Sequence, residues 1–158
     1  MDPILDVRNL QTHFFTKAGV LKAVDGVSFQ IGAGEIVGLV GESGSGKSIT
    51  GFSILGLVDP PGRIVGGEIL FSGRDLTKLP PAEIQKMRGS RIAMIFQDPM
   101  MTLNPVLRIE TQMTEAIQTH DSSVSKDEAR QRSRDALGMV GISSPGERMR
   151  AYPHQLSG

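Results

Sequence analysis

The sequence has no cysteine and no tryptophan, and aromatic residues make up only 4% of its 158 residues. Without cysteine there can be no disulfide scaffold, no thiolate zinc site and no cysteine nucleophile. So few aromatic side chains also argue against a large aromatic binding face. Long hydrophobic runs are missing as well. The longest, residues 36–40 and 54–58, hold five residues each, whereas a membrane-spanning helix needs about 20.

An excess of charge of one sign is absent too. The chain has 17 Lys+Arg and 17 Asp+Glu, so its formal net charge is zero, and the two signs balance on both sides of residue 110. Surfaces that bind nucleic acid carry a basic excess, so the composition predicts no nucleic-acid partner. The first residues show neither a basic nor a hydrophobic stretch, so no secretory signal is expected.

Glycine, in contrast, is abundant at 19 residues, which indicates tight turns and close backbone approaches. Short apolar or alternating segments predict β-strands over residues 5–10, 27–31, 35–40, 66–72 and 91–96. Apolar residues at helical spacing predict α-helices over residues 49–58, 81–88, 111–119 and 125–140. The predicted strands all precede residue 108, so the sequence predicts a mixed α/β unit over residues 1–108 and a helical unit over residues 109–158.

The last predicted helix carries two further signals. Ser125 and Glu128 have the spacing of a capping box, in which the serine oxygen accepts from the backbone and the glutamate reaches back. Arg130, Arg132 and Arg134 alternate with acidic residues, which is typical of a solvated, ion-paired face. The histidines are scattered along the chain, so we interpret them as surface or local hydrogen-bonding residues: His13, His120 and His154.

The clearest chemistry lies in the segment Gly41-Glu-Ser-Gly-Ser-Gly46-Lys47-Ser48, which fits G-x-x-x-x-G-K-[ST] at every fixed position. It lies between a predicted strand and a predicted helix, the context that a phosphate-binding loop requires. Gly44 and Gly46 can take positive φ angles and let the backbone curl around a polyphosphate. The helix that begins at about Lys47 turns its positive end toward the phosphates. Lys47 supplies a charge for the β/γ oxygens, and the Ser48 hydroxyl can ligate Mg²⁺.

Two alternatives fit this loop less well. A flexible Gly/Ser linker needs neither Lys-Ser at this offset nor hydrophobic elements on both sides. A dinucleotide-binding fingerprint that starts at Gly44 requires glycine at position 49, where the sequence has Ile49. A phosphate-binding loop alone still leaves kinases, GTPases, helicases and transporter ATPases open.

This choice is narrowed by the order and spacing of three more features: the aromatic pair Phe14 and Phe15, Gln97 at the end of a predicted strand, and the triplet Leu156-Ser157-Gly158. Taken singly, the pair has an ordinary interpretation as core aromatics, Gln97 as a solvated strand end, and the triplet as a chance match. Together, GESGSGKS, IFQDPMMTLNP and the ending YPHQLSG resemble the nucleotide-binding subunits of ABC transporters, and most of all the oligopeptide/dipeptide importer family. The resemblance covers essentially the whole chain. It implies an α/β P-loop NTPase fold: part of a RecA-like core with an antiparallel β subdomain, followed by an α-helical subdomain.

The resemblance also implies roles for individual residues. Phe14, or its neighbour Phe15, would stack on adenine, and Gln97 would touch Mg²⁺ and the attacking water and link the site to the membrane subunits. Lys47 and Gln97 would be the catalytic residues, and Ser48 and Gln97 would hold the metal. Ser157 and Gly158 would contact the ATP of a partner subunit, as part of the LSGGQ signature. The implied nucleotide contacts are Phe14, Gly41, Glu42, Ser43, Gly44, Ser45, Gly46, Lys47, Ser48 and Ile49.

The resemblance ends within that signature, so the Walker B aspartate, the catalytic glutamate, the D-loop and the switch histidine have no counterpart in these residues. Two apolar segments that end in aspartate imitate a Walker B strand. The first, residues 54–59, lies in the helix after the P-loop. In the second, residues 94–98, Gln97 has the Q-loop position and Pro99 stands where a glutamate is wanted. The 158-residue chain is therefore expected to bind nucleotide weakly and not to turn it over.

The function implied by the resemblance is import of di- or oligopeptides driven by MgATP binding and hydrolysis, and the complete protein would be an ATPase. Its partners would be membrane-embedded permease subunits, a second ABC ATPase subunit and, indirectly, an extracytoplasmic solute-binding protein. It would lie peripherally on the cytoplasmic face of the inner membrane. The alternatives are a soluble ABC ATPase of DNA repair or translation, and a non-catalytic nucleotide-binding module.

Overall fold

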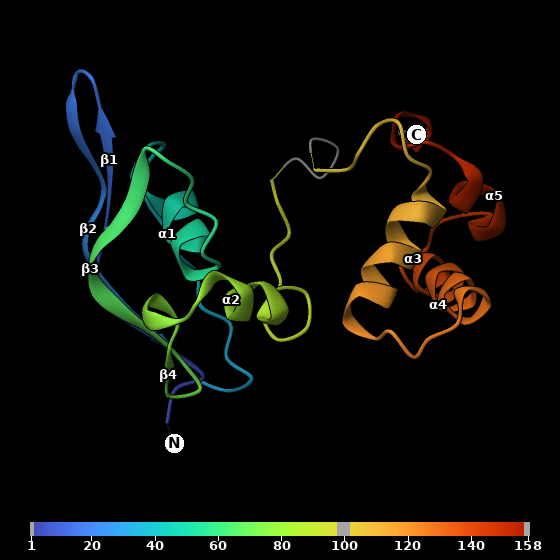
Figure 1. Cartoon of the computed structure of the whole chain (residues 1–158), viewed down its shortest axis with the longest axis horizontal. Helices are drawn as coiled ribbons and strands as arrows, with labels where there is room; N and C mark the ends of the chain where they lie inside the picture. Colours follow the sequence, from blue (N-terminus) through green and yellow to red (C-terminus); the bar gives the residue numbers. More distant parts are fainter. Residues whose placement is uncertain (1, 98–101, 157–158) are drawn as a thin grey trace. The chain divides into compact units, whose positions relative to one another are not determined.

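The computed structural model of the chain describes residues 2–97 and 102–156. The chain forms two compact units, Met1–Arg88 and Gly89–Gly158. Each unit has its own secondary structure (Figure 1) and its own buried side chains. The first unit contains every strand of the described chain, and the second is helical. The predicted division of the chain into a part of the nucleotide-binding core over residues 1–108 and a helical subdomain over residues 109–158 stays a prediction.

The first unit is built on a four-stranded antiparallel sheet in the order β2-β1-β3-β4 (Figure 1). Its strands are β1 (Leu5–Thr16), β2 (Gly19–Ile31), β3 (Gly62–Phe71) and β4 (Arg74–Asp75). The three long strands extend beyond the predicted ones. The pairing of β1 shifts register between Val7 and Leu10 and again between Thr12 and His13. These irregularities break the two-residue alternation from which the strand ends were predicted.

Two helices and a short 3₁₀ turn complete this unit. They are α1 (Lys47–Ile54), η1 (Leu76–Lys78) and α2 (Pro81–Met87). The α1 helix lies against β1 and β2, and the buried side chains between sheet and helix include Leu10, Val24 and Leu55. The predicted α1 end at residue 58 was wrong because Gly56, at φ 60°, closes the helix earlier. The Gly56 and Leu57 amides donate to the Ser53 and Phe52 carbonyls, a Schellman ending.

Two predicted strands are not formed. Residues 35–40 and 91–96 do not form regular strands. Ile36 and Val40 are 99% and 93% exposed. A segment becomes a strand only when a neighbouring strand pairs with its backbone. The strands β1 to β4 pair only among themselves. The predicted buried strand over residues 35–40 was therefore wrong: its apolar residues lie in an irregular, exposed segment, and the described chain offers it no partner strand.

The second unit packs α3 (Ile109–His120), α4 (Lys126–Met139) and α5 (Pro145–Arg150), followed by the short 3₁₀ turn η3 (Pro153–Gln155). Its buried apolar side chains are Ile109, Val124, Ala129 and Met149. In α4, Ala129 is fully buried, whereas Val140, the last residue of the predicted helix, is exposed. Gly141, at φ 78°, ends the helix as predicted.

Half of the predicted capping box is formed. The Ser125 hydroxyl accepts from the Glu128 amide at 3.2 Å, which confirms the N-cap of α4. The Glu128 carboxylate does not reach back to the Ser125 amide. It pairs with Arg132 one turn further along the helix, at 2.5 Å, because an oppositely charged side chain four residues away is a competing partner.

Candidate nucleotide-binding site

The loop over residues 41–46 joins the irregular segment 35–40 to α1. Gly44 and Gly46 have φ angles of 82° and 91°, which confirms the expectation that these two positions need the left-handed region. Gly46 is glycine for a second reason. A Cβ at this position would overlap the Ala23 carbonyl oxygen of β2. The loop backbone therefore lies too close to the β2 backbone for a side chain at position 46.

Lys47, the first residue of α1, folds its side chain back over the loop. Its ammonium donates to the Gly41 carbonyl at 2.7 Å, to the Glu42 carbonyl at 2.5 Å and to the Ser45 hydroxyl at 3.2 Å. The positive charge is thus held at the mouth of the loop, next to the N-terminal end of α1. A helix N-terminus and a lysine ammonium at one place favour a bound polyphosphate.

A pocket of about 390 Å³ joins this loop to the β1–β2 hairpin. Its lining brings Phe14 and residues of the P-loop to one space. The lining residues are Phe14, Leu21, Lys22, Ala23, Gly44, Gly46, Lys47, Ser48 and Ile49. Sequence reasoning missed Leu21, Lys22 and Ala23, because their place depends on the β1–β2 register, in which Phe14 pairs with Leu21.

The structure distinguishes the two neighbouring phenylalanines. Phe14 lines the pocket, whereas the ring of Phe15 carries the Arg63 guanidinium at 4.2 Å from its centroid. Phe14 is backed by Gly62, where a Cβ would lie 2.6 Å from the phenylalanine Cε1 and 2.8 Å from a Val58 methyl. The ring therefore lies directly on the β3 backbone.

Ser48 lines this pocket, but several other predicted site residues do not: Gly41, Glu42, Ser43, Ser45 and Gln97. The Ser48 hydroxyl is exposed and makes no hydrogen bond within the described part of the chain, so it is available to a metal ion. Glu42 and Ser43 are exposed loop residues. Gln97 is exposed and belongs to the second unit. Ser157 and Gly158 lie outside the described residues. So does Asp98, the last residue of the segment 94–98 that imitates a Walker B strand.

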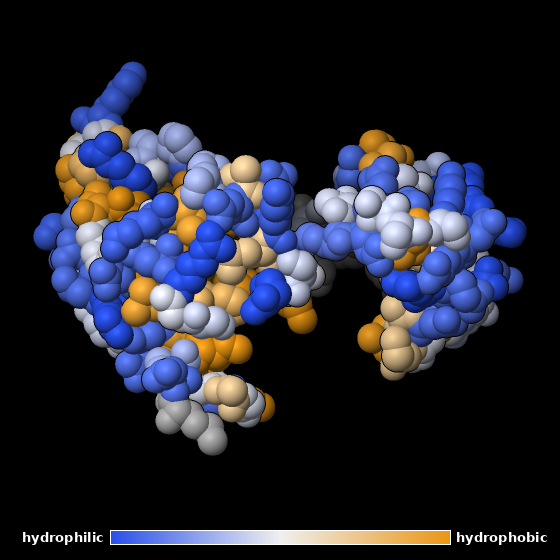
Figure 2. All heavy atoms as spheres, turned by 60° about the horizontal axis from the view of Figure 1, so that its bottom comes forward, coloured by the Kyte–Doolittle hydropathy of each residue, from blue (hydrophilic) through white to orange (hydrophobic). Residues whose placement is uncertain are grey.

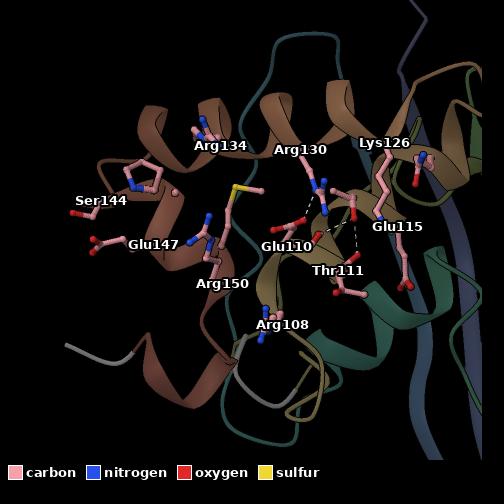
Figure 3. Close-up of a pocket in the computed structure, with 15 residues that line it drawn as sticks. Arg108, Glu110, Thr111, Glu115, Lys126, Arg130, Arg134, Ser144, Glu147 and Arg150 are labelled. Carbon is pink, nitrogen blue, oxygen red and sulfur yellow. Dashed lines mark hydrogen bonds and ion pairs between the residues drawn. The ribbon is translucent and has the colours of Figure 1, made fainter.

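The second unit contains a larger pocket, of about 1040 Å³, formed by side chains of α3, α4 and α5 (Figure 3). Both signs of charge line it, with Arg134 and Arg150 beside Glu110 and Glu147. Arg130 pairs with Glu110, and Arg132 outside the pocket pairs with Glu128. This confirms the ion-paired face predicted for α4. The pocket has no glycine-rich loop, so its side chains form a mixed ionic surface rather than a phosphate cradle.

Relatives of known sequence match the chain along its whole length. The oligopeptide transport ATP-binding protein AppD of Bacillus subtilis is 50% identical, covering 100% of this chain and 48% of its own. The dipeptide transport ATP-binding protein DppD of Escherichia coli is 44% identical, covering 98% of this chain and 47% of its own. The chain therefore spans about half the length of these relatives.

A solved structure confirms the expected fold. The dimeric ABC transporter cassette MJ0796 matches with a TM-score of 0.83 at 25% identity, covering 98% of this chain and 63% of that one. A second structure of MJ0796, bound to ADP and Pi after hydrolysis, matches equally well, with a TM-score of 0.83. The fold is that of a P-loop NTPase with an antiparallel β subdomain and a helical subdomain.

No helix in residues 2–97 and 102–156 combines the length and the apolar character needed to cross a membrane. The family model described as ABC transporter matches residues 24–158, which include the P-loop, the Gln97 segment and all the described helices of both units. With the geometry of the loop, the relatives and the fold in agreement, the chain belongs to the ABC transporter family.

Proposed function

We propose that this chain is the ATP-binding part of a peptide importer, and that binding and hydrolysis of MgATP drive uptake. The observation that carries the proposal is the pocket with Phe14 at the hairpin side and Lys47 at the loop side. An apolar ring and a phosphate cradle facing one space suit a nucleotide, whose base and polyphosphate have those two characters. The names of the relatives, which are dipeptide and oligopeptide transport proteins, support transport over DNA repair or translation.

In this proposal each side chain has one task. Phe14 stacks on the base, and the loop amides over residues 41–46 surround the phosphates. The Lys47 ammonium exchanges its carbonyl partners for β/γ oxygens. The Ser48 hydroxyl holds Mg²⁺, which neutralises charge on the phosphates when bound. Gln97 is proposed to orient the attacking water and contact the same ion, and Ile49 to line the pocket beside the phosphates.

The proposed partners follow from the relatives. Permease subunits embedded in the membrane would carry the solute, and a second ABC ATPase subunit would bring its signature to this ATP, as Ser157 and Gly158 would do in return. An extracytoplasmic solute-binding protein would act indirectly. The chain would lie peripherally on the cytoplasmic face of the membrane.

The nucleotide half of the proposal is tested by Lys47→Ala. Loss of a charge-assisted hydrogen bond costs about 1.5–3 kcal/mol, which is roughly a 10- to 150-fold weaker affinity. A fluorescent ATP analogue titrated into wild type and variant measures this. Lys17→Ala is the matched control, because Lys17 is an exposed lysine that does not line the pocket. Equal affinities of wild type and Lys47→Ala would contradict nucleotide binding at this loop.

The transport half is tested in cells. A strain lacking the gene is grown on a di- or oligopeptide as the sole source of a required amino acid, in a background without other peptide importers. The gene should restore growth, and its Lys47→Ala version should not. Peptide uptake that is unchanged by the deletion would contradict peptide import and favour another solute.

A further inference from the structure

A buried pair of hydroxyl groups joins the strand that carries Phe14 to the helix that carries Lys47. Thr12 Oγ1 of β1 lies 2.8 Å from Ser53 Oγ of α1. The two residues are 0% and 2% exposed. Ser53 Oγ also lies 2.7 Å from the Ile49 carbonyl oxygen, to which it donates.

The donor in each bond is fixed by proton counting. A hydroxyl has one proton, and a carbonyl oxygen can only accept. Since Ser53 gives its proton to Ile49, the Thr12 hydroxyl must donate to Ser53. The result is a chain of two hydrogen bonds: Thr12 of β1 donates to Ser53, and Ser53 donates to the Ile49 carbonyl in the first turn of α1. Both ends of this hydrogen-bond chain are next to the pocket, because Phe14 and Ile49 line it.

The sheet also approaches the residue before α1: a Cβ at Gly46 would overlap the Ala23 carbonyl oxygen and lie 3.4 Å from a Val24 methyl group. Packing of that kind has no preferred direction. A hydrogen bond does, since it weakens steeply with distance and angle. The Thr12/Ser53 contact therefore resists sliding of α1 along β1 in a way that packing does not.

From this geometry we infer that the Thr12/Ser53 contact sets the separation between Phe14 and the phosphate-binding loop. Thr12 and Ser53 are positioning residues for a ligand that uses both ends of the pocket. The inference rests on the proposed nucleotide binding. The inference distinguishes two ligand classes: a nucleoside triphosphate spans both ends of the pocket, whereas inorganic tripolyphosphate occupies the loop alone. Only binding of the nucleoside triphosphate depends on the distance between Phe14 and the loop.

Thr12→Val removes the donor and keeps the shape of the side chain. One intramolecular hydrogen bond contributes about 0.5–1.5 kcal/mol. Because ATP binding would then have to restore the separation that this bond sets, the ATP dissociation constant should rise by at most the same free energy, roughly 2- to 12-fold. Binding of magnesium tripolyphosphate should be unchanged. Thr12→Ser, which keeps the donor, should bind ATP like wild type. The measurements use the natural gene product with all its residues, by calorimetry or by competition with a fluorescent ATP analogue.

Ser133→Ala is the matched control for loss of a buried hydroxyl. Ser133 is 0% exposed and bonds to the Ala129 carbonyl at 2.8 Å in α4, within the second unit. It should change neither ligand's affinity. A Thr12→Val variant that binds ATP like wild type overturns the inference, as does one that loses ATP and tripolyphosphate equally. If Thr12→Val does not fold, Thr12→Ala takes its place beside Thr12→Ser, with the same expected split. Wild type that binds tripolyphosphate but not ATP overturns the proposed function itself.

Discussion

Phe14 can line the pocket because the β3 residue behind its ring has no side chain. The ring lies on Gly62, so its position is set by a neighbouring strand rather than by its own segment. The sequence predicts that one of two adjacent aromatics faces the nucleotide. Which of them does so depends on the pairing of β1 with β3, in which Phe14 lies opposite Gly62.

Gly62→Ala tests this support. The added methyl group would lie 2.6 Å from Phe14 Cε1, so the ring must move toward the pocket. Overpacking of this kind costs about 1–3 kcal/mol of folding stability. We expect weaker ATP binding with unchanged tripolyphosphate binding, and a lower midpoint in urea denaturation.

The matched control is Gly73→Ala, because Gly73 has open space around its Cβ position and lies on the β3–β4 turn. Its φ of 78° strains an alanine, so it should lower stability without affecting either ligand. ATP binding by Gly62→Ala that equals wild type would mean that the ring does not bear on the nucleotide.

Among single residues, the predictable ones were those whose roles are local. The positive φ angles of Gly44 and Gly46 follow from the loop motif, since only glycine takes them freely. Leu21, Lys22 and Ala23 could not be predicted, because they reach the pocket through the bulged register of β2 on β1. The hydrogen bond between the Thr12 and Ser53 hydroxyls could not be predicted for the same reason. The two residues are 41 positions apart, and nothing in either segment points to the other.

At the scale of elements, helix ends that depend on neighbouring residues were predicted better than strands, which depend on partner strands elsewhere in the chain. Ser125 and Gly141 mark the two ends of α4 as expected. Residues 35–40 and 91–96 have the composition of strands, but strand formation requires a partner that lies elsewhere in the chain. The early end of α1 at Gly56 was missed because the apolar pattern continues through it to residue 58.

The N-cap of α4 gives an element-scale prediction. Ser125→Ala leaves the Glu128 amide without its 3.2 Å acceptor, and such a loss costs about 1 kcal/mol of stability. Urea denaturation followed by circular dichroism should show the lower midpoint. Ser122→Ala is the control, since Ser122 is exposed in the preceding loop and makes no hydrogen bond within residues 2–97 and 102–156. Equal losses from both variants would show that the cap contributes nothing measurable.

At the scale of the whole chain, the most unusual feature is the apolar surface of residues 35–40. Ile36 and Val40 are almost fully exposed, and Val37 and Leu39 are also on the surface. Hydrophobic side chains are visible on the surface of the first unit in Figure 2. Exposed apolar segments with the composition of a strand are sites of association, because their backbone and side chains both lack partners.

We therefore expect the 158-residue polypeptide, expressed by itself, to self-associate and to bind the dye ANS. Replacing Ile36 and Val40 together by aspartate should lower both signals, since two carboxylates on this exposed segment oppose pairing with a second copy. Val106→Asp is the control: Val106 is 75% exposed but lies in the second unit, away from this segment in sequence. Light scattering gives the mass, and fluorescence the dye binding. A monomeric polypeptide without dye binding, or an equal decrease caused by Val106→Asp, would mean that residues 35–40 are not the associating surface.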